Sequence, residues 1–183
     1  KDPVSKYIPE FKGQSVMVPR DPKDPKAGYD LVPANREVTI RDLLSHTSGI
    51  SYRFWGNAAA PVYEEGGVPD GLSPNGGQTC DAMRKLAKLP LLHQPGSVYE
   101  YGLSTDVLGC LVEVVSGTTL DRFFKERIFK PVGMKDTQFF ISAGQRSRMA
   151  GLYIPDGKGG IARAADETIR WGTLMFAANQ PYQ

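Results

Sequence analysis

One stretch near the middle of the chain, QPGSVYEYGLSTDVLG at residues 94–109, decides the expected fold. It places Tyr101 between turn-forming residues and a run of apolar residues at helical spacing, which continues up to Gly117. Glycine is the usual residue just beyond the C-terminus of a helix. We therefore expect a turn that presents a tyrosine, followed at once by a buried helix.

Two further blocks flank this stretch, LLSHTSGI at residues 43–50 and PVGMKDT at residues 131–137. Together the three blocks resemble the serine β-lactamase and penicillin-binding-protein superfamily, and most closely its esterase branch, the family VIII carboxylesterases. The resemblance implies an α+β fold of the β-lactamase/transpeptidase type and covers most of the chain. We expect residues 1–183 to form the helix-rich central part of one such domain, with the nucleophile helix and much of the sheet supplied from outside this chain.

The same resemblance assigns a catalytic role to Tyr101. In the superfamily the serine of a Ser-x-x-Lys motif attacks the substrate, and the tyrosine of a Tyr-x-Asn motif transfers protons between that serine and the leaving group. Tyr101 matches this tyrosine. A free phenol has a pKa of about 10 and is a poor base at neutral pH, so it needs cationic neighbours. No serine here has a lysine three positions later, so the chain as given lacks such a nucleophile.

Position 103 departs from the family pattern. The lactamases and peptidases of the superfamily place asparagine there to hydrogen-bond the amide of the substrate, whereas this chain has Leu103. Losing a buried polar contact typically costs about 1–3 kcal/mol, which weakens an amide substrate and leaves a plain ester tolerable. The resemblance thus favours a carboxylesterase that cleaves short acyl esters through an acyl-serine intermediate, with β-lactamase or D-alanyl peptidase activity as the alternative.

Three aromatic residues in expected loops, Tyr52, Trp55 and Tyr153, are candidates for the walls of a substrate pocket, together with Leu103. Single aromatic residues in loops are more often packing anchors, so they rank below Tyr101 as site residues. An alternative of another class is a non-catalytic truncated homologue, or a fragment that binds a partner carrying the rest of the fold. A Ser-x-x-Lys segment upstream in the gene would decide for the enzyme.

Composition argues against several other classes of function. Twenty-two basic and 20 acidic side chains give a net charge of +2, which provides no strong field for nucleic acid. Two histidines without His-Glu-x-x-His spacing argue against a zinc site, and the resemblance implies no cofactor. Cys80 and Cys110 are too few for a disulfide framework and are expected to be buried, unpaired thiols.

The sequence contains neither a membrane span nor a targeting segment. No run of about 18 apolar residues is present, and the first residues lack the apolar core of a signal peptide. The sequence favours neither the cytoplasm nor the periplasm and leaves the oligomeric state open. A small-molecule ester and the remaining part of the same fold are the expected partners.

Helix starts are marked by capping patterns. Thr39 and Asp42 have the spacing of a capping box before a short helix. Thr79 is expected to cap the next helix, Ser104 the helix after Tyr101, and residues 118–121 a fourth.

The remaining segments are expected to connect these helices. Residues 13–36 read as an exposed connection because of their four prolines, and residues 55–77 as a long loop or lid. Residues 46–49 are expected to form a structural turn rather than a catalytic His/Ser pair. Residues 137–141 have strand character, and a final helix is expected after Asp166.

Overall fold

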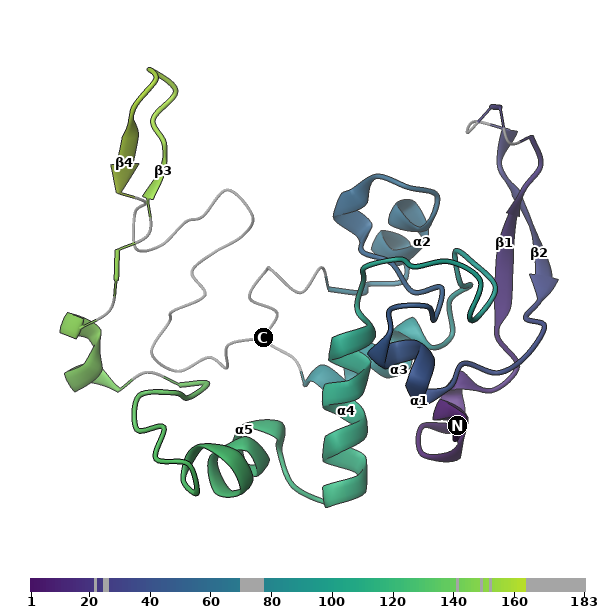
Figure 1. Cartoon of the computed structure of the whole chain (residues 1–183). Coiled ribbons are helices and arrows are strands. Elements are labelled where there is room, and N and C mark those ends of the chain that lie inside the picture. The colour runs from purple at the N-terminus through teal and green to yellow at the C-terminus, as the bar shows by residue number, and fades with distance from the viewer. Residues whose placement is uncertain are drawn as a thin grey trace. The chain divides into compact units, whose positions relative to one another are not determined.

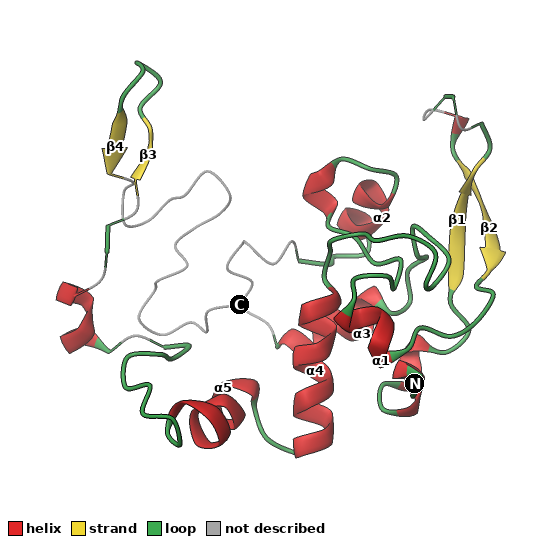
Figure 2. Ribbon diagram, in the orientation of Figure 1, coloured by secondary structure: helices red, strands yellow, loops and turns green. Residues whose placement is uncertain are grey.

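The computed structural model describes residues 1–21, 23–24, 27–69, 78–140, 142–148, 150–151 and 153–163. The chain divides into two compact units, Lys1–Asp70 with Gly77–Phe123, and Gly71–Gly76 with Phe124–Gln183 (Figure 1). The described residues form short helices and two antiparallel hairpins, one near each end of the described chain, so the fold is α+β as predicted (Figure 2). That residues 1–183 form a single partial domain stays a prediction.

The N-terminal segment contains a hairpin that we did not predict. Two single-turn helices, η1 (Val4–Lys6) and η2 (Pro9–Phe11), precede strand β1 (Ser15–Pro19), which pairs antiparallel with β2 (Tyr29–Pro33). Each strand ends on a proline, where the missing N–H does not interrupt the ladder. The expectation of an irregular connection over residues 13–36 is therefore wrong.

Strand β1 is anchored to the segment that leads to Tyr101. The backbone N–H of Met17 donates to the carbonyl oxygen of Leu91 at 2.8 Å, and the N–H of Leu91 donates to that of Ser15 at 2.8 Å. The side chains of Val16 and Met17 are buried in the core. The hairpin thus fixes the approach to the predicted site by both backbone and side-chain contacts.

Helix α1 (Ile40–Leu44) begins with the capping box that the sequence predicts. The hydroxyl of Thr39 accepts from the backbone N–H of Asp42, and the carboxylate of Asp42 accepts from the N–H of Thr39 at 2.8 Å. The guanidinium of Arg36 donates two further bonds to this carboxylate, at 2.6 and 2.9 Å. Asp42 is only 4% exposed. Burial disfavours its charge, but the bonds from Arg36 and Thr39 outweigh burial and lower the pKa of Asp42 from 3.8 to about 2.

Two longer helices form the centre of the first unit. Helix α4 (Ser104–Ser116) ends at Gly117, whose φ is +66°, as the apolar spacing predicts. Helix α3 (Thr79–Leu86) packs beside it. The core cluster of the unit includes Met83 and Leu86 from α3 and Val107 and Leu111 from α4.

The expected caps of these two helices are wrong. Leu103 and Gln78 occupy the N-cap positions, and neither makes a side-chain capping bond. Ser104 is instead the first helical residue, and its hydroxyl is buried 2.8 Å from that of Ser48. Tertiary packing rather than side-chain capping therefore determines where these two helices begin.

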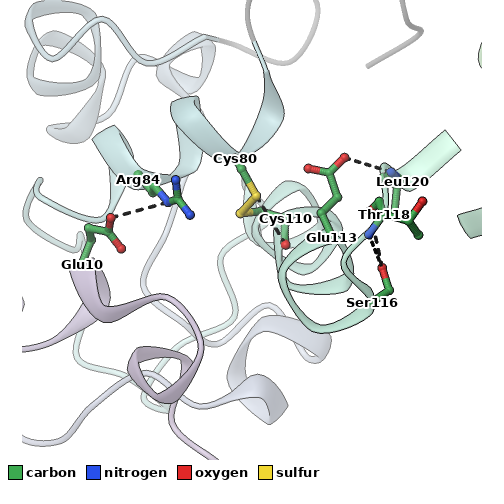
Figure 3. Close-up of a disulfide and its surroundings, with 8 residues drawn as sticks. All are labelled: Glu10, Cys80, Arg84, Cys110, Glu113, Ser116, Thr118 and Leu120. Carbon is green, nitrogen blue, oxygen red and sulfur yellow. Dashed lines mark hydrogen bonds and ion pairs between the residues drawn. A yellow bond between two sulfur atoms is a disulfide. The ribbon is translucent and has the colours of Figure 1, made fainter. Parts of the chain in front are cut away.

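A disulfide joins Cys80 in the first turn of α3 to Cys110 in the middle of α4, so the expectation of unpaired thiols is wrong (Figure 3). The two Cα atoms lie 4.7 Å apart because the helices pack side by side. A separation of 30 residues gives no sign of this contact in the sequence. The bridge closes a loop that contains Tyr101.

The predicted fourth helix is present as α5 (Leu120–Phe124), which continues into the π-helical turn η5 (Lys125–Phe129). The backbone N–H of Leu120 donates to the carboxylate of Glu113 on α4 at 2.9 Å (Figure 3). This bond ties the start of α5 to α4.

The segment expected to be a long loop contains regular structure. The 3-10 turn η4 (Arg53–Trp55) is followed by helix α2 (Ala59–Glu65). Tyr63 on α2 is buried, and its hydroxyl accepts a hydrogen bond from the backbone N–H of Ser51 at 3.3 Å. A buried tyrosine thus anchors a helix that could not be predicted because its sequence has little periodicity. Residues 70–77 of this segment lie outside the described residues.

In the second unit, η6 (Ala143–Arg148) precedes a short hairpin of β3 (Tyr153–Pro155) and β4 (Ile161–Arg163). Residues 137–140 form no strand, which corrects the expectation there. The helix expected after Asp166 lies outside the described residues. Within the described part of the chain, every helix is too short or too polar to cross a bilayer.

Removing the disulfide is expected to lower the free energy of unfolding by about 3–4 kcal/mol, because a closed loop of 30 residues restricts the unfolded chain. Urea unfolding with and without a reductant measures the effect. A variant with both Cys80→Ala and Cys110→Ala should unfold at the lower urea concentration whether or not reductant is present. Equal midpoints for the oxidised and reduced wild type would contradict the bridge.

Asp42→Asn is expected to lower the free energy of unfolding at pH 7 by about 2 kcal/mol, because the pKa of Asp42 falls from 3.8 to about 2 on folding. A carboxyl group whose pKa is lowered on folding stabilises the folded state at pH values above its pKa in the unfolded state. The contribution of Asp42 therefore disappears as the pH falls toward 2. Denaturant midpoints of the two proteins should therefore converge in acid.

Asp30→Asn is the matched control, because it removes an exposed ion pair with Arg20. It should change the free energy of unfolding by no more than about 1 kcal/mol at any pH. A deficit of Asp42→Asn that persists undiminished at pH 2 would contradict the assignment.

Candidate active site

Tyr101 lies directly before the first turn of α4, with its side chain 49% exposed. The centroid of its ring lies 4.8 Å from that of His46 and 5.5 Å from that of Tyr52. The indole Nε1 of Trp55 donates to the carbonyl oxygen of Tyr101 at 3.0 Å. The structure thus brings Tyr52 and Trp55, both predicted from the sequence, to Tyr101.

Tyr52 and Trp55 belong to a continuous aromatic surface. The rings of Tyr52 and Phe54 stack at 4.6 Å, and that of Phe54 contacts Trp55 at 5.0 Å. We call Tyr52, Phe54 and Trp55 the aromatic wall. Trp55 is more than half exposed, so the wall presents apolar area to solvent beside the phenol.

Two glycines allow the segment before the wall to approach the tyrosine turn. A Cβ at Gly102 would lie 2.6 Å from the Cα of Ser51, so any side chain there would push the two segments apart. Gly49 has a φ of +84°, and a Cβ there would collide with the backbone of His93. The absence of a side chain at position 102 is therefore a packing requirement.

The turn at residues 46–49 is structural, as predicted. The hydroxyl of Ser48 accepts a hydrogen bond from the backbone N–H of Ile50 at 3.1 Å. Ser48 and Ser104 are both fully buried and hydrogen-bonded to each other. Neither hydroxyl can reach a substrate as a nucleophile.

Two titratable groups near the tyrosine turn have raised pKa values. Burial raises the pKa of Tyr52, and the charge of Asp106 and hydrogen bonding to Tyr101 raise it further. Burial also raises the pKa of Asp106, in the first turn of α4. Burial therefore favours the neutral forms of both groups.

Sequence reasoning missed the polar residues behind Tyr101. The carboxylate of Glu100 accepts hydrogen bonds from the hydroxyl of Ser51 at 2.6 Å and from the Nδ2 of Asn57 at 3.3 Å. The Nε2 of His93 lies 3.6 Å from its other oxygen. Only the adjacency of Glu100 to Tyr101 could have pointed to this cluster, because its members are scattered over four loop positions.

The sequence also predicts Leu103 and Tyr153 as substrate-binding residues. The side chain of Leu103 is 1% exposed and belongs to the core, so the prediction that it contacts substrate is wrong. Leu103 is the N-cap residue of α4, and its buried neighbours in the first turn are Ser104 and Val107. Tyr153 is an exposed residue of β3 in the second unit.

The described residues offer a phenol and an apolar surface rather than a metal centre. Over the ranges that the structure describes, no three His, Cys, Asp or Glu side chains gather as metal ligands. Tyr101 can move a proton at its phenolic oxygen, and the aromatic wall can hold an apolar group beside it.

Comparison with known proteins finds one matching family and relatives that include esterases. The Beta-lactamase family model matches residues 1–180. Lovastatin esterase from Penicillium rubens is 35% identical over 155 residues, which are 84% of this chain and 37% of that protein. Esterase EstB from Burkholderia gladioli is 33% identical over 144 residues, 79% of this chain and 33% of that protein.

The fold of the chain is also similar to that of a solved hydrolase structure. EstCE1, a hydrolase with promiscuous acyltransferase activity, superposes with a TM-score of 0.68 and 27% identity, covering 97% of this chain and 47% of that one. The chain therefore spans between a third and a half of the length of these three proteins.

Leu103→Asn is expected to lower the free energy of unfolding by about 2–4 kcal/mol, because it buries an amide without a partner in place of a core side chain. Leu44→Asn is the matched control, since Leu44 is 69% exposed, and it should change stability by only about 0.5 kcal/mol. Thermal and urea unfolding of both variants measure the difference. Equal effects of the two substitutions would contradict the placement of Leu103 in the core.

Proposed function

Because the chain belongs to the β-lactamase family, we propose that it forms part of a serine hydrolase that cleaves short acyl esters through an acyl-serine intermediate. In this proposal Tyr101 is the proton-transfer residue. The observation that carries it is the half-exposed phenol on a rigid turn beside an apolar wall. Similarity to lovastatin esterase and to Esterase EstB supports an ester as the substrate.

The chemistry requires a nucleophile that residues 1–183 do not contain in the form of a Ser-x-x-Lys motif. We propose that such a segment comes from another part of the protein. The serine oxygen attacks the ester carbonyl while its proton passes to the phenolic oxygen of Tyr101, and Tyr101 then gives that proton to the leaving alcohol. Water attacks the acyl-serine and loses its proton by the same route, which restores the serine.

The lysine of that motif would supply a cation beside Tyr101. A free phenol has a pKa of about 10 and is mostly protonated at neutral pH. A nearby ammonium group offsets this effect and favours the anionic form that accepts the serine proton.

The aromatic wall suits the acyl or alcohol part of an ester. Apolar and aromatic side chains line most small-molecule sites, with few polar groups to fix orientation. The bond from the indole of Trp55 to the backbone of Tyr101 holds the wall and the phenol in one arrangement.

Tyr101→Phe, made in the full-length protein that contains this chain, is expected to lower kcat by about 10²–10⁴-fold, because it removes one proton-transfer group and keeps the ring. Steady-state hydrolysis of p-nitrophenyl butyrate, measured beside thermal unfolding, tests this. The unfolding temperature should change little.

Tyr99→Phe is the matched control, because Tyr99 is an exposed neighbour whose ring contacts His46 at 5.9 Å. It should keep near wild-type turnover. Comparable turnover in Tyr101→Phe would remove Tyr101 from the mechanism. A collapsed unfolding temperature would make Tyr101 a packing residue instead.

A further inference from the structure

Glu100 and Tyr101 are neighbours in the chain but contact different groups. The carboxylate of Glu100 bonds to the hydroxyl of Ser51, and the ring of Tyr101 contacts that of Tyr52. Two consecutive residues of one segment therefore face two consecutive residues of another. This pairing fixes the register between the tyrosine turn and the start of the aromatic wall.

The backbone on both sides of Tyr101 is held as well. The N–H of Glu100 donates to the carbonyl oxygen of His46 at 2.8 Å, and the carbonyl oxygen of Tyr101 accepts from Trp55 at 3.0 Å. His46 has a φ of +53°, the one positive value outside glycine among the described residues. The left-handed conformation at His46 is uncommon for such a residue, so the contacts around it must maintain it.

The bonds of Glu100 are sheltered from water and connected to each other. Its side chain is only 20% exposed, and Ser51 is fully buried. Asn57 donates through Nδ2 to the hydroxyl of Ser51 at 2.7 Å as well as to Glu100, and its Oδ1 accepts from the backbone N–H of Ala59 at 3.1 Å. Buried and linked hydrogen bonds of this kind rigidify the backbone that they join.

We propose that Glu100 is a positioning residue, whose carboxylate acts as the acceptor that locks the backbone of Tyr101 to the segment carrying the aromatic wall. The inference rests on the proposed role of Tyr101 in proton transfer. Its physical basis is that proton transfer requires the phenolic oxygen within hydrogen-bonding reach of its partner, and a displacement of about 1 Å can cost about 10²-fold in rate.

The test uses the full-length protein that contains this chain, with p-nitrophenyl butyrate as substrate. Glu100→Ala is expected to lower kcat by about 10- to 100-fold while KM changes by less than about threefold. Glu100→Gln keeps a side-chain oxygen for Ser51 to donate to, and is expected to restore kcat to within about threefold of wild type. Unfolding temperatures, measured on each variant, ensure that every assay is run on folded protein.

Ser51→Ala removes the donor and leaves the carboxylate in place. It is expected to lower kcat in the same direction as Glu100→Ala, and adding it to Glu100→Ala should produce little further loss because the two residues share one interaction. If Glu100→Ala does not fold, Ser51→Ala carries the test alone.

Glu113→Ala and Glu113→Gln are the matched controls, because Glu113 is a carboxylate of the same unit that bonds to the backbone of Leu120 on α5 (Figure 3). Both should keep wild-type kcat. A kcat for Glu100→Ala no lower than that for Glu113→Ala overturns the proposal. A kcat for Glu100→Gln as low as that for Glu100→Ala also overturns it, because the charge rather than the acceptor is then required.

Tyr101→Phe in the same assay separates this inference from the proposed function. If Tyr101→Phe keeps its turnover, the proposed function fails and the positioning role fails with it. If Tyr101→Phe loses turnover while Glu100→Ala keeps it, the positioning role alone is wrong.

Discussion

Asp42 holds three parts of the chain together through one buried carboxylate. It accepts hydrogen bonds from Arg36, from the start of α1 at Thr39, and from the hydroxyl of Thr47 at 3.3 Å. The carbonyl oxygen of Thr47 accepts in turn from the N–H of Gly96 at 2.7 Å. A buried charge that loses a partner is strongly destabilising, so these bonds are all required at once. The cap of a five-residue helix thereby fixes the turn that leads to Tyr101.

From this anchor, two segments pair through their backbones. Carbonyl oxygens of His46, Thr47 and Gly49 accept from N–H groups of Glu100, Gly96 and Leu92 respectively. The order runs in opposite directions along the two segments, as in an irregular antiparallel pair. This explains why the blocks at residues 43–50 and 94–109 occur together, because each satisfies the backbone groups of the other. The tyrosine turn has its shape only against the earlier segment.

Features that depend only on residues close in the sequence could be predicted from it. The capping box at Thr39 and Asp42 spans four residues, and the apolar stripe of α4 needs only its own periodicity. The turn that carries Tyr101 was predicted from the residues around it. What the sequence could not reveal depends on distant partners, such as the bridge between Cys80 and Cys110 or the bond between Ser51 and Glu100, 49 positions apart.

Leu103 shows why a motif position can mislead about a side chain. Its place two residues after the tyrosine predicted a substrate contact, but the first turn of α4 points inward. Leu103, Ser104 and Val107 are all buried there, while Tyr101 remains exposed. Gly102 makes the change of direction possible, because only a residue without a side chain fits against Ser51. Burial rather than motif spacing decides which of these side chains can meet a substrate.

The surroundings of Tyr101 hold its backbone but leave about half of the residue exposed. Hydrogen bonds at Glu100 and at the carbonyl oxygen of Tyr101 hold the backbone on both sides, while Tyr101 itself is 49% exposed. A nearby cation favours the deprotonated form of a phenol, which is the form that accepts a proton. The proposed mechanism therefore needs a cation beside the fixed phenol, which is the role proposed for the lysine of the Ser-x-x-Lys motif. The proposed activity therefore depends on the assembly of the whole domain, because the proposed lysine and Tyr101 belong to different parts of it.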